Sequence, residues 1–305
     1  MSQTMPVPAT AAPRRRFGSQ DLAPGDPRLG ELRESNALLG DLPALRARYE
    51  EDGYLLIRGL HDREEVLAAR RQMLEKVEAA GGIDPSHPLM DAVIRHGGQN
   101  AGDLTQVPAF QHLVAAPRLM RFFGDFFGGP ALTYDFKWLR LIQTGWDTGA
   151  HYDIVYMGRG TEKVLTCWTP LGAVPYEQGP LAICVGSHRA EGFAKLRATY
   201  GRMDVDRDRV GGWFSNEPLE VGEKYGCRWA STEFQPGDAL IFGMFTMHAS
   251  LVNLSDRYRL SSDTRYQLAS EPVDERWVGE KPIGHYGWNA GPQVPMEEKR
   301  KEWGV

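Results

Sequence analysis

The hydrophobic pattern divides the chain into a helical first part and a strand-rich second part. In residues 41–51 and 62–77, apolar side chains recur at the spacing of an amphipathic helix, and each segment begins with an aspartate suited to an N-cap. Residues 117–127 repeat this helical pattern, with phenylalanines on the apolar face. The short apolar run of residues 54–57 predicts a buried strand between the first two helices.

From Leu132 onward the texture changes to strands joined by turns. Residues 134–142 alternate as one half-buried strand would, and further strands are predicted at 164–169, 181–185, 239–242, 247–252 and 259–268. Strands of this length predict an antiparallel sandwich or barrel. A charged insertion, residues 190–232, interrupts the pattern, and it is read either as a lid or binding loop or as a surface excursion.

The order of these elements predicts the domain organisation. Helices before strands favour an α+β, mainly β fold in which an N-terminal helical layer supports one β core. Residues 1–28 are rich in Pro, Ala, Ser and Arg and are expected to be a mobile tail, whereas residues 29–305 are expected to form a single domain. The aromatic-rich segment 277–288 is expected to pack over the core, near its mouth.

Composition narrows the class of partner. A net charge of −5 gives no electrostatic case for nucleic acid or for an anionic membrane surface, and no apolar run is long enough to span a bilayer. The three cysteines lack metal-type spacing, which suits a reducing compartment. We therefore expect a cytoplasmic protein that acts on a small molecule.

A candidate metal site lies at His151-Tyr152-Asp153. On an extended strand, positions two residues apart face the same side, so an imidazole and a carboxylate would lie together. His248, which follows a Pro-Gly-Asp turn and a strand, is the natural third ligand. Such a facial triad leaves coordination positions open and suits Fe(II), although zinc accepts the same ligands.

A candidate anion site follows the third ligand. Arg259 and Ser261 are two positions apart on a predicted strand, and Ser250 shares a strand face with His248. A guanidinium with an adjacent hydroxyl can grip a carboxylate through two hydrogen bonds. A metal triad beside such a clamp predicts an oxo acid that chelates the metal at one end and is held by Arg259 at the other.

The candidate metal and anion residues form part of a longer series of motifs that occur in a fixed order along the chain. The motifs are Asp52-Gly53-Tyr54, the pair His151 and Asp153, Trp168, Gly179-Pro180-Leu181, Gly186-Ser187-His188-Arg189, Pro236-Gly237-Asp238, His248 and Arg259. From about Tyr49 to Leu268 the chain resembles the phytanoyl-CoA dioxygenase family of Fe(II)/2-oxoglutarate oxygenases, which also includes ectoine hydroxylases.

This resemblance implies a double-stranded β-helix, of the jelly-roll or cupin type, with O2 and 2-oxoglutarate as co-substrates. It implies that His151, Asp153 and His248 bind iron, and that Arg259 holds the distal carboxylate of 2-oxoglutarate. Ser250 and Trp168 would line the co-substrate pocket. The expected reaction is hydroxylation of a small organic molecule with release of succinate and CO2, and an acidic residue at Asp153 disfavours a halogenase.

The substrate stays open at this point. Two residues depart from the family pattern. Tyr152 stands where some relatives have glutamine, and Val185 stands where proline is usual. The substrate of a relative therefore does not predict the substrate of this protein. An acyl-CoA, an amino-acid derivative and a secondary metabolite are all compatible with the sequence, and the oligomeric state is not readable. The alternative functions are a non-catalytic barrel that senses a small acid and a cupin-type metalloenzyme that does not use 2-oxoglutarate.

Other side chains are weaker candidates for ligand contact. Arg265, Tyr152, Tyr156 and Trp213 lie in segments that could meet a substrate. His188 is expected either to stabilise a turn or to reach the pocket. His285 is expected to be a surface or packing residue.

Overall fold

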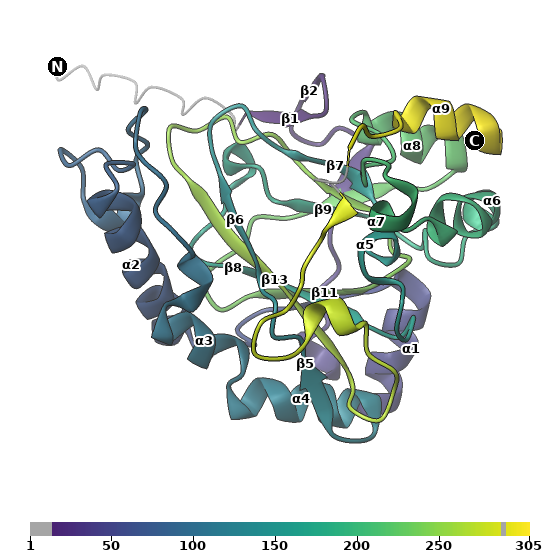
Figure 1. Cartoon of the computed structure of the whole chain (residues 1–305), viewed down its shortest axis with the longest axis horizontal. Helices are drawn as coiled ribbons and strands as arrows, with labels where there is room; N and C mark the ends of the chain where they lie inside the picture. Colours follow the sequence, from purple (N-terminus) through teal and green to yellow (C-terminus); the bar gives the residue numbers. More distant parts are fainter. Residues whose placement is uncertain (1–13, 288–290) are drawn as a thin grey trace, which may run out of the picture.

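Two β-sheets face each other at the centre of the molecule (Figure 1). The computed structural model describes residues 14–287 and 291–305. The larger sheet has the order β4 (Tyr54–Ile57), β11 (Ala239–Gly243), β8 (Leu165–Pro170), β13 (Arg259–Leu268) and β5 (Ala131–Thr133), and β6 (Trp138–Ile142) also pairs with β13. The smaller sheet has the order β3 (Leu29–Glu31), β10 (Trp229–Ser231), β9 (Leu181–Cys184), β12 (His248–Ser250) and β7 (Thr148–His151). The predicted antiparallel sandwich is confirmed, with one parallel pair between β10 and β3.

Side chains of both sheets fill the space between them. Trp168 and Phe242 of the larger sheet form one buried cluster with Leu181 and Ile183 of the smaller sheet. Their strand neighbours point the opposite way, because side chains alternate along a strand. Thus Cys184 packs in a separate cluster behind the smaller sheet. The alternation makes the inward-facing positions of each strand predictable once one of them is known.

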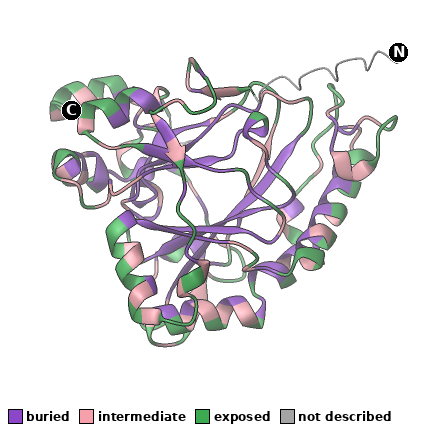
Figure 2. Ribbon diagram, turned by 180° about the vertical axis from the view of Figure 1, so that it is seen from behind, coloured by how far each residue is buried: buried purple, intermediate pink, exposed green. Residues whose placement is uncertain are grey.

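Four helices cover the outer face of the larger sheet: α1 (Leu42–Asp52), α2 (Arg63–Ala79), α3 (Pro108–Val114) and α4 (Pro117–Phe127). On β13, Tyr266 faces α4 and stacks on Phe123 with ring centroids 4.0 Å apart. Leu260 of the same strand packs in the cluster of α2 and α3. Figure 2 shows the strands buried and the outer sides of these helices exposed. The predicted helical layer is confirmed.

The predicted helix caps are also present. Asp41 accepts a hydrogen bond from the backbone of Ala44 at 3.0 Å, and Asp62 accepts bonds from Glu64 and Glu65 at 2.8 and 3.1 Å. Each cap satisfies backbone N–H groups that have no partner within the first turn. These local signals explain why the helix starts were readable from the sequence.

The predicted single strand over residues 134–142 is wrong, because the chain leaves the sheet after β5 and returns at β6. The backbone N–H groups of Asp135 and Phe136 both donate to the carbonyl of Trp277, at 3.0 and 3.1 Å. This contact with the C-terminal segment replaces the sheet ladder there. The predicted strand at 247–252 is likewise shortened to β12, at residues 248–250.

The expected mobile tail is not what the structure shows for residues 14–28. A hairpin of β1 (Arg15–Phe17) and β2 (Gln20–Leu22) forms there, and Phe17 is fully buried with its ring 5.0 Å from that of Trp229. Leu22 of the same hairpin is buried in the same cluster, so two apolar side chains anchor a segment whose composition is otherwise largely polar. Residues 1–13 lie outside the described residues.

The insertion and the C-terminus cover the other side of the molecule. The insertion contributes α6 (Ala194–Ala198), α7 (Val205–Asp208), α8 (Pro218–Tyr225) and strand β10. With α5 (Ile154–Met157) and α9 (Met296–Trp303), these helices lie beside the smaller sheet, on the right of Figure 1. None of the helices in the described part of the chain is long and apolar enough to cross a membrane.

The stacking of α4 on β13 gives a stability prediction. Phe123→Ala removes a fully buried ring from the interface between helix and sheet, and we expect the free energy of unfolding to fall by about 3–5 kcal/mol. Denaturant titration followed by circular dichroism measures the change. Phe122→Ala is the matched control, because this neighbouring ring is only partly buried; an equal loss in both variants would contradict the packing described here.

Candidate metal centre and cavity

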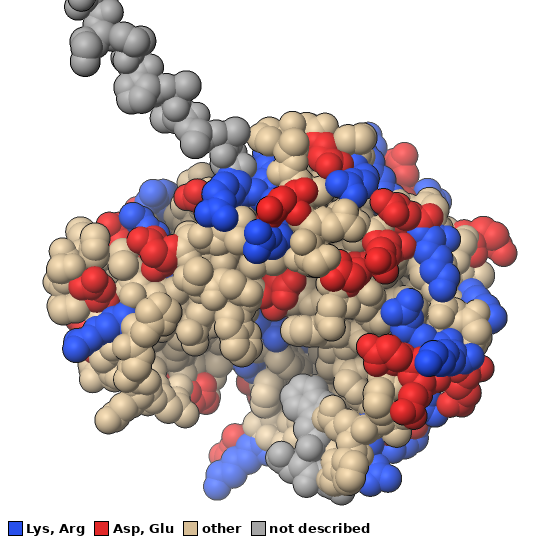
Figure 3. Space-filling model, turned by 90° about the horizontal axis from the view of Figure 1, so that it is seen from above, with Lys and Arg blue, Asp and Glu red and all other residues tan. Residues whose placement is uncertain are grey.

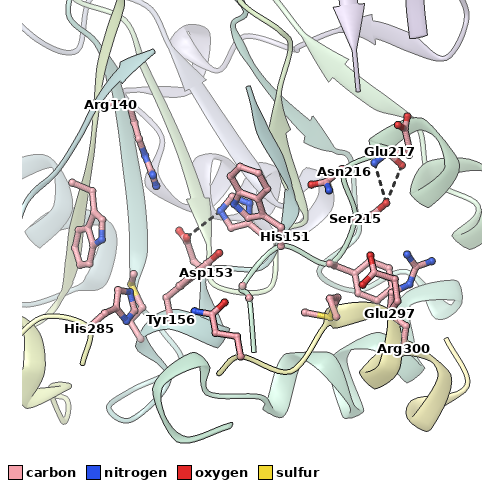
Figure 4. A pocket seen from close by; sticks show the side chains of 18 of the residues that line it. Arg140, His151, Asp153, Tyr156, Ser215, Asn216, Glu217, His285, Glu297 and Arg300 are labelled. Atoms are coloured by element: carbon pink, nitrogen blue, oxygen red, sulfur yellow. Dashed lines mark hydrogen bonds and ion pairs between the residues drawn. The ribbon is translucent and has the colours of Figure 1, made fainter. Parts of the chain in front are cut away.

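Two histidines from neighbouring strands and one aspartate from a helix start converge inside the barrel. His151 ends β7 and His248 begins β12, and the two residues lie opposite each other in the antiparallel pair. One ligand atom from each of His151, Asp153 and His248 lies within 4.8 Å of the other two. Nε2 of His151 is 3.9 Å from Oδ1 of Asp153 (Figure 4). Nε2 of His248 is 3.8 Å from the same oxygen. The structure thus brings the predicted triad together.

The strand argument for the spacing of His151 and Asp153 is wrong, although the pairing itself holds. Strand β7 ends at His151, and Asp153 already has the backbone angles of a helix, φ −67° and ψ −27°. Its carbonyl accepts a hydrogen bond from the N–H of Tyr156 at 3.0 Å. The turn into α5, rather than strand alternation, directs the carboxylate back toward the imidazole.

Backbone contacts fix the tautomer of both histidines. Nδ1 of His151 lies 2.8 Å from the carbonyl oxygen of Gly149, and Nδ1 of His248 lies 3.0 Å from that of Thr246. A carbonyl can only accept, so each Nδ1 carries the hydrogen and each Nε2 presents a lone pair. Burial lowers the pKa of both imidazoles below the ordinary value, and for His151 the neighbouring His248 lowers it further. Both rings are therefore neutral, and each can donate the lone pair of its Nε2 to a metal ion.

The carboxylate of Asp153 is held at both oxygens. The hydroxyl of Thr166 donates to Oδ2, and Nη2 of Arg265 lies 3.2 Å from Oδ1. Burial alone would raise the pKa of Asp153, but the neighbouring guanidinium of Arg265 and the hydrogen bond from Thr166 lower it below its usual value. Two neutral imidazoles and one ionised carboxylate, without a thiolate, are the donor set that suits Fe(II). The residues present therefore fit the metal.

Strand β13 carries a row of charged and polar side chains into the barrel. Asp263 pairs with Arg140 of β6 at 2.8 Å, and Arg265 pairs with Asp153, so the alternating positions 259 and 261 face the same interior. Arg259 is 1 % exposed. Its Nη1 donates to the carbonyl of Gly179, but its Nε has no partner, and within the described ranges no carboxylate lies at ion-pair distance.

Among the described residues that face the barrel interior from β13, Arg259 is thus a buried cation without a counter-charge. Burial lowers the pKa of Arg259 to about 10, so its guanidinium is still protonated at neutral pH. The hydroxyl of Ser261, which faces the same interior, is also buried and has no hydrogen-bond partner among the described residues. An unpaired guanidinium in a protein interior is costly, and a carboxylate ligand would relieve that cost. The predicted anion clamp thus has the chemistry of a carboxylate site.

The two remaining residues of the predicted co-substrate pocket lie inside the barrel. Ser250 accepts a hydrogen bond from the N–H of Thr148 at 2.9 Å. Trp168 packs on Phe234 with ring centroids 4.8 Å apart, in the cluster that also contains Phe242. The ring of Phe242 lies 4.4 Å from that of His248. Contact of Ser250 and Trp168 with the co-substrate stays a prediction.

A cavity of about 700 Å³ opens beside His151 and Asp153 (Figure 4). Four parts of the chain line it: strands β6 and β13 of the larger sheet, the end of β7 with α5, the middle of the insertion, and the C-terminal segment. Besides His151 and Asp153, the lining residues include Trp138, Arg140, Tyr156, Met157, Trp213, Phe214, Glu217, Arg265, His285, Met296, Glu297 and Arg300. The cavity therefore extends from the triad to a mouth built by segments outside the barrel.

The insertion reaches the cavity because it adds to the edge of the smaller sheet. The N–H of Phe214 donates to the carbonyl of Ala150, and the N–H of Ala150 donates to the carbonyl of Ser215, both at 2.8 Å. Gly212 packs so closely on Tyr156 that a Cβ atom would lie 1.9 Å from the phenol oxygen. Residues 211–217 thus lie along the strand that carries His151, and their movement as a lid stays a prediction.

Of the four residues that the sequence suggested as further substrate contacts, three line the cavity: Arg265, Tyr156 and Trp213. Tyr152 does not, because its buried ring points away and stacks on Tyr200 at 5.5 Å. His188 does not line the cavity either, and its Nε2 lies 3.0 Å from the carbonyl oxygen of Glu50 in the last turn of α1.

Some cavity residues escaped the sequence analysis. His285, expected at the surface or in packing, lines the cavity, and its Nδ1 lies 3.1 Å from a carboxylate oxygen of Asp206. Arg140 lies on a predicted strand, and the alternation there would have placed it inside once one inward position was known. Thr166 does not line the cavity but bonds Asp153, and it follows from the same alternation on its own predicted strand. The residues of α9 carried no signal, because only tertiary packing brings that helix to the mouth.

The fold and the site together define a class of protein. Two facing antiparallel sheets with a His-Asp-His set between them are the core of a double-stranded β-helix metalloenzyme. The model of the family called phytanoyl-CoA dioxygenase matches residues 49–261, which is more than half of the chain. The protein therefore belongs to the phytanoyl-CoA dioxygenase family of Fe(II)/2-oxoglutarate-dependent oxygenases, as the sequence motifs predicted.

Three similar proteins illustrate this relation. The 1-deoxypentalenic acid 11-beta-hydroxylase of Streptomyces exfoliatus is 27 % identical over 299 residues, which cover 91 % of this chain and 94 % of that protein. The crystal structure of EctD from S. alaskensis with bound Fe covers 93 % of this chain and 95 % of that one, with a TM-score of 0.55 and 17 % identity. The epimerase SnoN in complex with Fe3+, alpha ketoglutarate and nogalamycin RO covers 84 % and 98 %, with a TM-score of 0.52 and 18 % identity. The two structures confirm the fold class.

The converging triad predicts the effect of removing one ligand. His151→Ala should weaken metal binding by about 100-fold or more, because loss of a ligand exceeds the effect typical of losing a ligand's hydrogen-bond partner. Calorimetric titration with Mn(II), or with Fe(II) under nitrogen, measures the affinity. His188→Ala is the control, since this histidine only bonds the backbone of Glu50; wild-type metal affinity in His151→Ala would count against the assignment.

Proposed function

We propose that this oxygenase hydroxylates a compact, largely apolar small molecule. The observation that carries the proposal is the pairing of two sites within one barrel. One is a His-Asp-His set with neutral imidazoles and an ionised carboxylate, and the other is the buried guanidinium of Arg259 without a counter-charge. A metal with open positions and a carboxylate clamp together suit 2-oxoglutarate, which carries a chelating end and a distal carboxylate.

When bound, iron and 2-oxoglutarate supply the oxidising chemistry: one oxygen atom of O2 enters the substrate, and the other enters succinate as CO2 is released. The protein holds the reactants in place. Arg259 holds the distal carboxylate of 2-oxoglutarate, with Ser261 and Ser250 as neighbouring hydroxyls. The carbonyls of Gly149 and Thr246 hold the two imidazoles in the tautomer that presents Nε2. Trp168 and Phe242 fill the barrel beside His248 and exclude water.

The walls of the cavity support an apolar substrate body. Trp138, Tyr156, Met157, Phe214 and Met296 supply aromatic and apolar surface around a space of about 700 Å³, which is in the range of cavities for small ligands. The two inner cations are already paired, Arg140 with Asp263 and Arg265 with Asp153. A substrate of the same general kind as the acid named for the Streptomyces hydroxylase therefore fits better than a polyanionic acyl-CoA.

The mouth of the cavity has mixed charge. Glu217, Glu297 and Arg300 line it, and the guanidinium of Arg300 lies 4.7 Å from the ring centre of Phe214 (Figure 4). On the face drawn in Figure 3, basic and acidic side chains are interspersed rather than gathered by sign. We propose that residues 211–217 and α9 act as the cover that closes over a bound substrate.

We propose a cytoplasmic location for this activity. The cysteines Cys167, Cys184 and Cys227 are all free thiols, and the first two are buried. Unpaired thiols in a folded chain are typical of a reducing compartment. Fe(II) is also easier to retain in such a compartment than in an oxidising one.

The proposal predicts turnover of 2-oxoglutarate. The purified protein with Fe(II) and ascorbate should convert 2-oxoglutarate to succinate even without its prime substrate, and faster with it. Succinate is quantified by chromatography and mass spectrometry. Iron binding without affinity for 2-oxoglutarate would favour a cupin-type metalloenzyme instead, and binding of 2-oxoglutarate without any turnover would favour a sensing barrel.

Arg259→Gln tests the clamp within the same assay. Loss of one partner of a buried charged pair costs about 2–5 kcal/mol, so the KM for 2-oxoglutarate should rise roughly 30-fold or more while metal affinity is kept. Arg70→Gln is the matched control. Arg70 is also a buried arginine that bonds backbone carbonyls, those of Leu171 and Met90, but it lies on α2 in the helical layer rather than on an inward position of a strand. An unchanged KM in Arg259→Gln would reject the clamp.

A further inference from the structure

Arg265 is the charged residue of β13 that lies nearest to the triad. Its side chain is buried at 2 % exposure, and it lines the cavity together with His151 and Asp153. Its Nη2 donates to Oδ1 of Asp153 at 3.2 Å. This is the oxygen that both histidine Nε2 atoms approach, so the guanidinium lies at the edge of the metal position.

Three contacts restrain the guanidinium. Besides the bond to Asp153, Nε lies 3.2 Å from the sulfur of Met157, and the guanidinium lies 4.6 Å from the ring centre of Trp138. A cation over an aromatic face is attracted to it, and the thioether is a weak acceptor. The side chain is therefore held in one orientation before any ligand binds.

One donor of this restrained group has no partner. Nη1 of Arg265 is buried and makes no hydrogen bond within the part of the chain that the structure describes. Five N–H donors in a fixed fork can serve two acceptors at once. An unpaired charged donor in a protein interior is unfavourable, so its persistence here is explained most simply by a ligand that uses it.

We propose that Arg265 is a second anion-binding residue, whose Nη1 donates to the carboxylate beside the keto group of 2-oxoglutarate. This inference rests on the proposed function. Arg259 and Arg265 face the same interior from one strand, so a dicarboxylate would be held by one guanidinium at each end. Nη2 would meanwhile keep its contact with Asp153. Arg265 thus selects a ligand with a carboxylate at its chelating end.

The alternative is that Arg265 only positions Asp153. Thr166 provides the comparison, because its hydroxyl also bonds Asp153, at the other oxygen, and Thr166 does not line the cavity. Thr166→Val should weaken metal binding and leave the affinity for 2-oxoglutarate unchanged once the metal site is saturated. If Arg265 were only a positioning residue, Arg265→Gln would behave in the same way.

The experiment measures ligand affinity at saturating Mn(II) by calorimetry, with 2-oxoglutarate and with 2-oxobutyrate, which keeps the chelating end but lacks the distal carboxylate. Arg265→Gln should weaken both ligands by about tenfold or more. Arg259→Gln should weaken 2-oxoglutarate only. Arg70→Gln controls for loss of a buried guanidinium away from the cavity, and thermal unfolding confirms that each variant is folded.

Each outcome decides between the possibilities. If Arg265→Gln binds both ligands as tightly as the wild type at saturating metal, the inference is overturned and the proposed function stands. If Arg265→Gln loses affinity for 2-oxoglutarate but keeps it for 2-oxobutyrate, the guanidinium does not contact the chelating end, and the inference is again overturned. If the wild type itself shows no metal-dependent binding of 2-oxoglutarate, the proposed function fails and the inference fails with it.

Discussion

The antiparallel pairing of β7 with β12 is the constraint on which the site depends. It places His151 directly opposite His248, although nearly one hundred residues separate them along the chain. The chain then turns at Asp153, and the carboxylate comes back between the two rings. Neighbouring groups hold these three side chains in place. Backbone carbonyls set the tautomers of the two imidazoles, and Thr166 and Arg265 bond the carboxylate. The insertion docks on the free edge of the same strand, so the mouth of the cavity is built on the strand that carries the metal ligand.

Strand β13 gives the barrel interior a positive charge that the neighbouring carboxylates do not fully neutralise. Its inward positions carry Arg259, Ser261, Asp263 and Arg265, and its outward positions pack Leu260 and Tyr266 against the helices. The outward face thus fastens the sheet to its helical layer while the inward face presents donors. Arg140 and Asp263 neutralise each other, and so do Arg265 and Asp153, which leaves the positive charge of Arg259 for a ligand. The same ten residues therefore serve stability and recognition.

The sequence predicted those features of the fold that depend on residues close together in the chain. The aspartate caps, the helix-ending glycine at position 53 and the bounds of β13 could be read directly, because they depend on neighbours in sequence. The triad and Arg259 were found because their residue types and order are unusual. The break between β5 and β6, the anchoring of Phe17 and the approach of α9 to the cavity could not be predicted, since each depends on a contact with a distant segment. His285 lacked a signal for the same reason.

A crystal structure of the protein prepared anaerobically with Fe(II) and 2-oxoglutarate tests the joint metal and co-substrate site directly. We expect a single ion bound by Nε2 of His151, Nε2 of His248 and a carboxylate oxygen of Asp153 at about 2 Å, with the distal carboxylate of 2-oxoglutarate on Arg259. An ion bound elsewhere, or a co-substrate whose carboxylates leave Arg259 unpaired, would contradict this expectation.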